Sequence, residues 1–217
     1  MKRPRKARSP EVRLEDLRIA IVGGGRVGTS FAAALRRSGL EVEGPLGRDS
    51  TGEGAGVVLL CVPDRAIRDA AALIAPGPLV GHTSGATPLE VLAPRERFLL
   101  HPLRSIAGPE TPLAGAYAAV AGSSDRALGV AEALARHLGF TAFQVSEEER
   151  PLYHAAASLA ANALVALLWD AERVAASAGL PRDALFPLAQ GALESWRTHG
   201  APAALTGPIA RGDEATV

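Results

Sequence analysis

The stretch IAIVGGGRVGTSFAAALRRSG, residues 19–39, decides the fold. It places Gly23, Gly25 and Gly28 in the order G-x-G-x-x-G. The apolar run before the motif, residues 17–22, has the length of a strand, and apolar side chains after it recur at helical spacing. The glycines alone could form nothing more than a tight turn, but the order strand, glycine turn, helix is the context in which this motif binds a dinucleotide. The sequence therefore predicts a dinucleotide-binding loop.

Each glycine has a separate expected role. Gly23 permits the sharp turn, Gly25 lets the backbone approach a pyrophosphate, and Gly28 lets the helix pack closely on the strand. The free N–H groups at the start of the helix, at Arg26 and Val27, are expected to face the phosphates, whose negative charge the helix dipole favours. For the Arg26 side chain, a phosphate contact and a solvated turn position are both open.

Strands and helices alternate along the first two thirds of the chain. Residues 56–62 form a continuous apolar run, typical of a parallel strand covered on both faces, which Pro63 ends. Asp64 is expected to N-cap the next helix, and Pro102 to close a later strand. Further strands are predicted at 40–47, 79–82, 98–101, 116–120 and 142–145, and a helix at 124–138. This pattern predicts an α/β fold with a doubly wound, mostly parallel Rossmann sheet.

Ligands of such a sheet bind at the carboxyl ends of its strands. Val62 and Pro63 are therefore expected to line the cofactor, and Ser84 to contact the cofactor or take part in catalysis. His101 ends a strand and is a catalytic candidate, and Arg104 is a candidate carboxylate clamp.

The pattern changes at Ser146. Ser146 and Glu149 form a capping box, and no helix breaker follows Pro151 until Gly179. A second helix is predicted over 182–198. We expect a basic disordered tail at 1–13, a Rossmann domain at 14–145 and a smaller all-α domain at 146–217. Small alanine side chains along the long helix predict close packing against another helix or a second subunit, and hence a homodimer.

The residues after the second strand bear on the choice of cofactor. Arg48 stands 20 positions after Gly28, where an arginine accepts the 2′-phosphate of NADP, and Ser50 adds a hydroxyl donor. We therefore expect NADP rather than NAD, although Asp49 could instead hydrogen-bond an unphosphorylated ribose.

Composition excludes several classes of function. Acidic residues outnumber basic ones after the tail, which argues against nucleic acid as the main partner. No secretory signal and no apolar run of membrane-spanning length is evident, so neither a signal peptide nor a membrane is expected. The single cysteine, Cys61, fits a reducing cytoplasm. No spacing typical of metal ligands occurs, and no metal site is predicted.

A reductase needs a proton donor, and the body of this chain contains no lysine, because Lys2 and Lys6 both lie in the tail. His154, Ser158 and Asn162 fall on one side of the long helix at about 3.6 residues per turn. We expect His154 as the acid and Asn162 as an orienting residue, with His101 as the substitute acid. Interhelical hydrogen bonding remains an alternative use of these side chains, and His82 is expected in the core.

Several segments together resemble a known family: "LLCVPDRAI", "GHTSG", "LHPLRS", "ERPLYHAAASLAANALVAL" and "ALTGPIARGD". The chain is similar to the bacterial Rossmann-like oxidoreductases with a C-terminal helical domain of unknown function. These resemble ketopantoate reductases, pyrroline-carboxylate reductases and NADP-dependent deazaflavin oxidoreductases. The resemblance implies NADP and a helical dimer, and it leaves the substrate open.

Two departures from related families matter. Hydroxyisobutyrate-type dehydrogenases carry K-x-x-x-N on the long helix; Asn162 matches the asparagine, but Ser158 stands in place of the lysine. Residues 212–217 are typical of the first turn of a helix that similar proteins continue, so a truncated C-terminal end is expected. We expect an NADP-dependent reductase of a small keto acid or cyclic imine, or alternatively a non-catalytic NADP-binding sensor or assembly protein.

Overall fold

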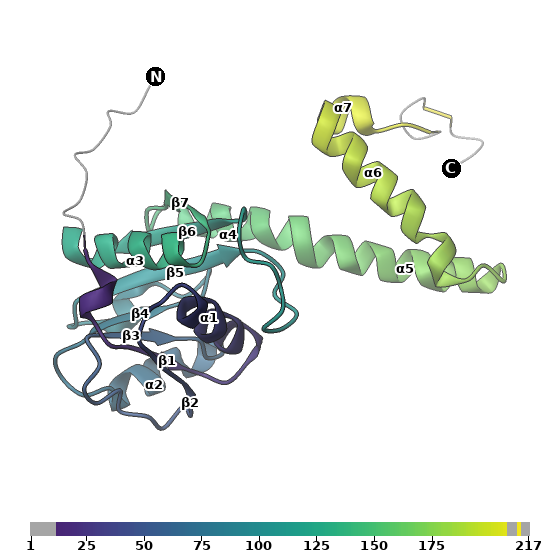
Figure 1. The fold of residues 1–217 in the computed structure, drawn as a ribbon. Coiled ribbons are helices and arrows are strands. Elements are labelled where there is room, and N and C mark those ends of the chain that lie inside the picture. Colours follow the sequence, from purple (N-terminus) through teal and green to yellow (C-terminus); the bar gives the residue numbers. More distant parts are fainter. Residues whose placement is uncertain (1–11, 208–211, 214–217) are drawn as a thin grey trace, which may run out of the picture. The chain divides into compact units, whose positions relative to one another are not determined.

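The computed structural model describes residues 12–207 and 212–213 (Figure 1). The chain forms two compact units, Met1–Ser158 and Leu159–Val217. Most of the predicted basic tail, residues 1–11, lies outside the described residues, and so do residues 214–217 of the expected C-terminal helix start.

The first unit is built on a seven-stranded sheet with the order β2-β1-β3-β4-β5-β6-β7. The strands are β1 (Ile19–Val22), β2 (Val42–Leu46), β3 (Val57–Leu60), β4 (Leu79–His82), β5 (Arg97–Leu103), β6 (Tyr117–Gly122) and β7 (Thr141–Gln144). All neighbouring strands run parallel except β5 and β6, which are antiparallel. The predicted mostly parallel Rossmann sheet is therefore confirmed.

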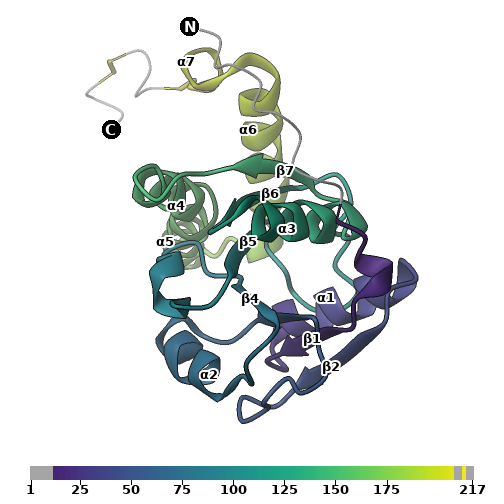
Figure 2. The same cartoon turned by 90° about the vertical axis from the view of Figure 1, so that its left-hand side faces the viewer.

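Helices cover both faces of this sheet (Figure 2). On one face, Phe31 and Leu35 of α1 (Arg26–Arg37) and Leu134 of α3 (Asp125–His137) pack into one core with Ile21 and Leu59. On the other face, α2 (Ile67–Leu73) and Tyr153 of α4 (Arg150–Ser158) pack against the alternate side chains of the same strands. The continuous apolar runs of β1 and β3 follow from this two-sided burial.

Some boundaries differ from the sequence predictions. β5 continues through Pro102, which lies opposite Ala118 of β6. Pairing with β4 ends at Leu99, so the missing N–H of Pro102 costs no ladder bond on that side. Asp64 does not cap α2: it begins a short 3-10 turn, Asp64–Ala66, and no side chain caps the helix that follows. Ser124 caps α3 as a typical N-cap, accepting a hydrogen bond from the N–H of Ala127.

The predicted long helix is present over Arg150–Ser177, but it is not uniform. It consists of α4, a π-helical segment over Leu159–Ala163, and α5 (Leu164–Ser177). The capping box forms, since Ser146 accepts a hydrogen bond from the N–H of Glu149 and the Glu149 carboxylate accepts from Ser146.

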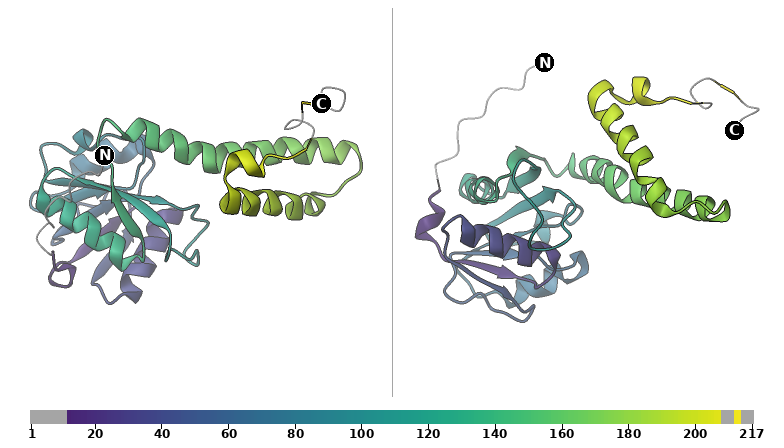
Figure 3. Two further views of the ribbon diagram at one scale, coloured as in Figure 1. Left: turned by 90° about the horizontal axis from the view of Figure 1, so that it is seen from above. Right: turned by 45° about the vertical axis from the view of Figure 1, so that its right-hand side comes forward.

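The second unit is all-helical, as expected. In it, α5 is followed by a 3-10 turn over Arg182–Ala184, then by α6 (Phe186–His199) and α7 (Ala201–Ala204) (Figure 3). Arg182 and Glu172 form an ion pair at 2.9 Å between α5 and this turn. Many apolar side chains of the unit are exposed, among them Leu167 (69%), Trp169 (64%) and Phe186 (68%).

The helix Arg150–Ser177 is long and apolar enough to cross a membrane by length and composition, contrary to the expectation from the sequence. Its first residues, however, belong to the folded first unit. Arg150 is 2% exposed, and the ring of Tyr153 packs on Phe143 of β7. Residues already packed on a sheet are not free to enter lipid. The length and composition of this helix are therefore weak evidence for a membrane span.

Candidate functional site

The glycine loop lies at the carboxyl end of β1, and the space around its three glycines differs. Gly23 has φ +115°, and a Cβ there would lie 2.3 Å from the carbonyl oxygen of Cys61. A Cβ at Gly28 would lie 1.9 Å from the carbonyl oxygen of Gly23. Gly25 instead faces open space, with nothing within 4 Å of such a Cβ. Two of the glycines are thus needed for packing, and the third leaves the backbone accessible.

The loop leads directly into α1. Gly25 is the N-cap residue, and its carbonyl accepts from both the backbone N–H and the hydroxyl of Thr29. Arg26 is exposed and Val27 is half-buried at the first positions of the helix. The N–H groups of this first turn are therefore available to a ligand at the open face of Gly25.

The predicted cofactor-selecting residues form a turn after β2. The N–H of Ser50 donates to the carbonyl of Gly47 at 3.2 Å, and the Ser50 hydroxyl accepts from the N–H of Gly52 at 3.3 Å. Arg48 is exposed at the tip of this turn, and Asp49 is exposed beside it. These two hydrogen bonds define the turn that carries the exposed Arg48 side chain.

The ends of β3 and β4 supply the next residues along the edge. Val62 is buried and Pro63 is exposed, immediately after β3. After β4, the Ser84 hydroxyl donates to the hydroxyl of Thr87 and accepts from the N–H groups of Ala86 and Thr87. This hydroxyl is engaged in shaping its own loop, and a catalytic or cofactor-binding role for Ser84 stays a prediction.

His82 is a core residue, as expected, with its side chain fully buried. Its Nδ1 accepts a hydrogen bond from the N–H of Ser84 at 3.2 Å. Burial lowers the pKa of His82 to about 4, so its imidazole is neutral at physiological pH. His82 thus helps to fix the loop that follows β4.

Two further histidines meet beside this loop. His101 comes from β5 and His154 from α4, and their ring centroids lie 6.0 Å apart in an edge-to-face arrangement. Tyr153 joins them: its hydroxyl lies 2.5 Å from Nδ1 of His101. Nδ1 of His154 is buried and has no hydrogen-bond partner among the described residues. The structure therefore brings His101 and His154 together, and their catalytic roles stay predictions.

Gly85 is the point on which the two histidines converge. A Cβ on Gly85 would lie 2.5 Å from Nδ1 of His154 and 3.0 Å from Nε2 of His101. The first distance is shorter than real Cβ contacts and the second is at their lower limit, so both imidazoles pack closely on the Gly85 backbone. A residue other than glycine would displace the two rings.

Electrostatics keeps His101 neutral. Burial, with a smaller contribution from the nearby His154, lowers its pKa to about 4, and Asp64 opposes the shift. Burial also raises the pKa of the Tyr153 hydroxyl far above its ordinary value. At neutral pH His101 and Tyr153 are therefore neutral hydrogen-bonding groups.

A buried arginine fixes α4 against the loop after β4. The Arg150 guanidinium donates to the carbonyl of Thr87 and pairs with Glu147. The N–H of Leu89 donates to the same Glu147 carboxylate at 3.4 Å. These contacts hold the start of α4 in place, and with it Tyr153 and His154.

The remaining predicted site residues lie outside the histidine cluster. Asn162 is exposed, lies in the second unit, and belongs to the π-helical segment, across which the assumed helical period does not hold. Its orienting role stays a prediction, and so does the clamp role of Arg104, which is exposed after β5. The two other histidines lie near helix ends, as expected: His137 contacts the Ser38 hydroxyl and His199 the carbonyl of Ser195.

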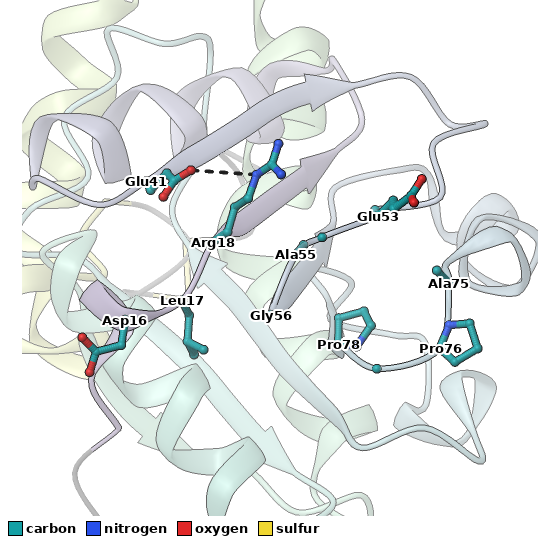
Figure 4. Close-up of a pocket in the computed structure, with 13 residues that line it drawn as sticks. Asp16, Leu17, Arg18, Glu41, Glu53, Ala55, Gly56, Ala75, Pro76 and Pro78 are labelled. Atoms are coloured by element: carbon teal, nitrogen blue, oxygen red, sulfur yellow. Dashed lines mark ion pairs between the residues drawn. The ribbon is translucent and has the colours of Figure 1, made fainter.

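Another cavity, of about 630 Å³, lies at the opposite edge of the sheet (Figure 4). Its lining comes from segments that precede β1, β2, β3 and β4, including Asp16, Arg18, Glu41 and Glu53. Arg18 is ion-paired there with Glu43 at 2.9 Å and with Glu41 at 3.9 Å. Ligands of open α/β sheets bind at the carboxyl edge instead, so we place the candidate site at the histidines rather than in this cavity.

Sequence reasoning missed Tyr153 and Arg150, although both stand in the quoted segment ERPLYHAAAS. Tyr153 directly precedes His154, which is the signal that could have drawn attention to it. Among the described residues, no group of three or more His, Cys, Asp and Glu side chains could hold a metal ion.

The fold defines a Rossmann-like protein with a C-terminal helical unit, and comparisons agree. Residues 116–217 match the model of a domain of unknown function, DUF2520, which confirms the resemblance expected from the sequence. Among curated proteins, none is a significant match in sequence.

Three solved structures show the same fold. BF3122 from Bacteroides fragilis, described as a proposed NADP oxidoreductase, is 22% identical with a TM-score of 0.81, over 94% of this chain and 89% of its own. TM1727 from Thermotoga maritima is 24% identical with a TM-score of 0.79, over 91% of this chain and 87% of its own. Pyrroline carboxylate reductase from Plasmodium falciparum, solved with NADP bound, is 12% identical with a TM-score of 0.62, over 88% and 82%.

Proposed function

We propose that this protein is an NADP-dependent oxidoreductase that transfers a hydride between NADPH and a small keto acid or a cyclic imine. One observation carries the proposal: an open glycine loop and the paired rings of His101 and His154 share the carboxyl edge of β1, β3, β4 and β5. The names of two structural neighbours, a proposed NADP oxidoreductase and a reductase with NADP bound, support it.

The residues present fit the cofactor. Gly25 leaves open backbone for a pyrophosphate, and the N–H groups at Arg26 and Val27 start a helix there. Arg48 and Ser50 would hold the 2′-phosphate, and Val62 and Pro63 would line the cofactor after β3. When bound, the nicotinamide supplies or accepts the hydride.

The histidines supply the acid–base chemistry of the proposal. His154 has a buried Nδ1 without a partner among the described residues, which a substrate oxygen or nitrogen would satisfy. We assign His154 as the general acid, because an imidazole can give up and take up a proton at a ring nitrogen. Asn162 would orient the substrate carbonyl or carboxylate, and His101 is the substitute acid.

The helical unit is proposed to form a homodimer. Its exposed apolar side chains include two tryptophans, Trp169 and Trp196, and a phenylalanine, Phe186. Aromatic side chains exposed in this number are typical of an interface. A second copy of the same unit offers a matching apolar surface, as a symmetric dimer requires.

The competing proposal is a non-catalytic NADP-binding sensor or assembly protein. The lysine-free body favours it, because the lysine that related dehydrogenases carry on the long helix is replaced by Ser158. A steady-state assay with NADPH and a panel of 2-keto acids and cyclic imines separates the two. Turnover of a panel member supports the reductase, whereas tight NADPH binding without any turnover supports the sensor.

A further inference from the structure

We propose that Tyr153 is a positioning residue that holds His101 in the tautomer protonated on Nε2, so that His101 presents an N–H donor beside Gly85. The tautomer follows from this chain alone. Its use, to donate a hydrogen bond to the substrate, rests on the proposed reductase function.

The geometry allows two directions for the Tyr153–His101 hydrogen bond. The hydroxyl can donate to an unprotonated Nδ1, or a protonated Nδ1 can donate to the phenolic oxygen. In the second case the Tyr153 proton would need a different acceptor. Within the described part of the chain, the hydrogen bond recorded for this hydroxyl is the one to His101. The first direction therefore satisfies both groups.

The charge states agree with this direction. Burial keeps Tyr153 protonated and His101 neutral at physiological pH. Three groups act on the His101 charge, and they come from two elements: Asp64 in the turn after β3, and His154 and Arg150 on α4. A neutral imidazole carries one proton, so an Nδ1 that accepts from Tyr153 leaves that proton on Nε2.

Nε2 of His101 lies on the side of the ring that faces Gly85. Nε2 of His101 would lie 3.0 Å from a Cβ built on Gly85, and Nδ1 of His154 would lie 2.5 Å from the same Cβ. The two nitrogens thus lie near one point. The arrangement divides their work: His101 donates a fixed hydrogen bond, and His154 exchanges the proton.

The ring of Tyr153 is held independently of its hydroxyl. It packs edge-to-face on Phe143 of β7, with ring centroids 5.6 Å apart. It also contacts the core formed by Val145 and its neighbours. Tyr153→Phe therefore removes the hydroxyl and keeps the packing. Tyr117, the other tyrosine of the chain, is exposed on β6 and offers Tyr117→Phe as a matched control.

The test is ¹⁵N NMR of the full-length protein labelled at histidine, recorded at neutral pH without substrate. His101→Gln identifies the His101 signals among the five histidines. We expect Nε2 of His101 in the range of a protonated ring nitrogen and Nδ1 in the range of an unprotonated one. Tyr153→Phe should move the chemical shifts of both His101 nitrogens towards the average of the two tautomers. Tyr117→Phe should leave both shifts unchanged.

Two results would overturn the proposal: Nδ1 protonated in the wild-type protein, or His101 shifts in Tyr153→Phe identical to those of the wild type. The wild-type spectrum decides even if the variant folds poorly. The NMR readout needs no turnover, so a protein that fails every reductase assay can still pass this test. Failure of the proposed function and failure of this inference are thereby kept apart.

Discussion

At the scale of single residues, His101 and His154 differ in what satisfies their ring nitrogens. Nδ1 of His101 is engaged by Tyr153, whereas the buried Nδ1 of His154 lacks a partner among the described residues. A buried nitrogen left without a hydrogen bond carries a cost that a bound substrate can remove. This difference is the structural basis for placing the acid at His154.

His154→Gln should lower turnover by roughly 10²–10⁴-fold, the usual contribution of a general acid, with NADPH affinity unchanged. Steady-state kinetics and NADPH fluorescence titration measure the two effects. His137→Gln, at the half-buried end of α3 and away from this cluster, is the matched control. Full turnover in His154→Gln together with its loss in His101→Gln would instead place the acid on β5.

Arg48→Ala should weaken NADPH binding by about 1.5–3 kcal/mol, the range for a hydrogen bond to a charged group. NADH affinity should barely change, because NADH lacks the 2′-phosphate. Titration of both cofactors measures this, with Arg68→Ala on the exposed face of α2 as the control. Equal losses of affinity for NADPH and NADH would contradict the assignment of Arg48 to the 2′-phosphate site.

Stability should fall with acid because of the buried histidines. The pKa of His82 and of His101 is lowered from 6.5 to about 4 in the folded protein. Between pH 4 and pH 6.5 the unfolded chain binds more protons than the folded protein does. The contribution of these histidines to stability is therefore complete above pH 6.5 and is lost as the pH falls towards 4.

Urea unfolding at about pH 7.5 and about pH 4.5 measures this loss, which for each histidine is on the order of 2–3 kcal/mol. His101→Gln should show a smaller difference between the two pH values than the wild type. An equal difference in both proteins would mean that His101 does not titrate in this window.

At the scale of elements, the strand–glycine–helix unit was predictable because its signals are local. The apolar run, the glycine spacing and the helical period all lie within residues 17–39. The caps at Ser124 and Ser146 were predictable for the same reason. The extension of β5 through Pro102 was not, because it depends on which neighbour lies beside that residue.

The candidate site was only partly predictable. The carboxyl-edge rule indicated His101, and helical spacing indicated His154. The hydrogen bond between Tyr153 and His101 joins residues 52 positions apart, and no local sequence pattern predicts it. The π-helical segment over Leu159–Ala163 likewise escaped a prediction that assumed one regular helical period.

The two kinds of glycine in the loop give an element-scale prediction. Gly28→Ala should destabilise the protein, because its Cβ would lie 1.9 Å from the backbone oxygen of Gly23. Gly25→Ala should fold normally, since nothing lies within 4 Å of its Cβ and its φ of −75° suits any residue. It should nevertheless weaken NADPH binding, because the methyl group occupies the open face.

Thermal unfolding and NADPH titration of both variants check this contrast. Unchanged NADPH affinity in a folded Gly25→Ala protein would contradict a pyrophosphate at this loop. Unchanged thermal stability in Gly28→Ala would contradict the close approach of α1 to β1.

At the scale of the whole molecule, the helical unit should associate with a second copy. Trp169→Glu should shift the protein from dimer to monomer, because a charge at an apolar interface must be desolvated. Sedimentation at micromolar concentration measures this, and Leu73→Glu, at an exposed apolar position of the first unit, is the matched control. A wild-type monomer under the same conditions would contradict the proposed dimer.

The central claim, an NADP site completed by the histidines at the carboxyl edge, is tested most directly by a crystal structure of the protein soaked with NADP. The account predicts the pyrophosphate on Gly25 and the nicotinamide C4 within contact of His101 and His154. Cofactor density in the cavity lined by Arg18 and Glu41 at the opposite edge, or a nicotinamide remote from both histidines, would contradict it.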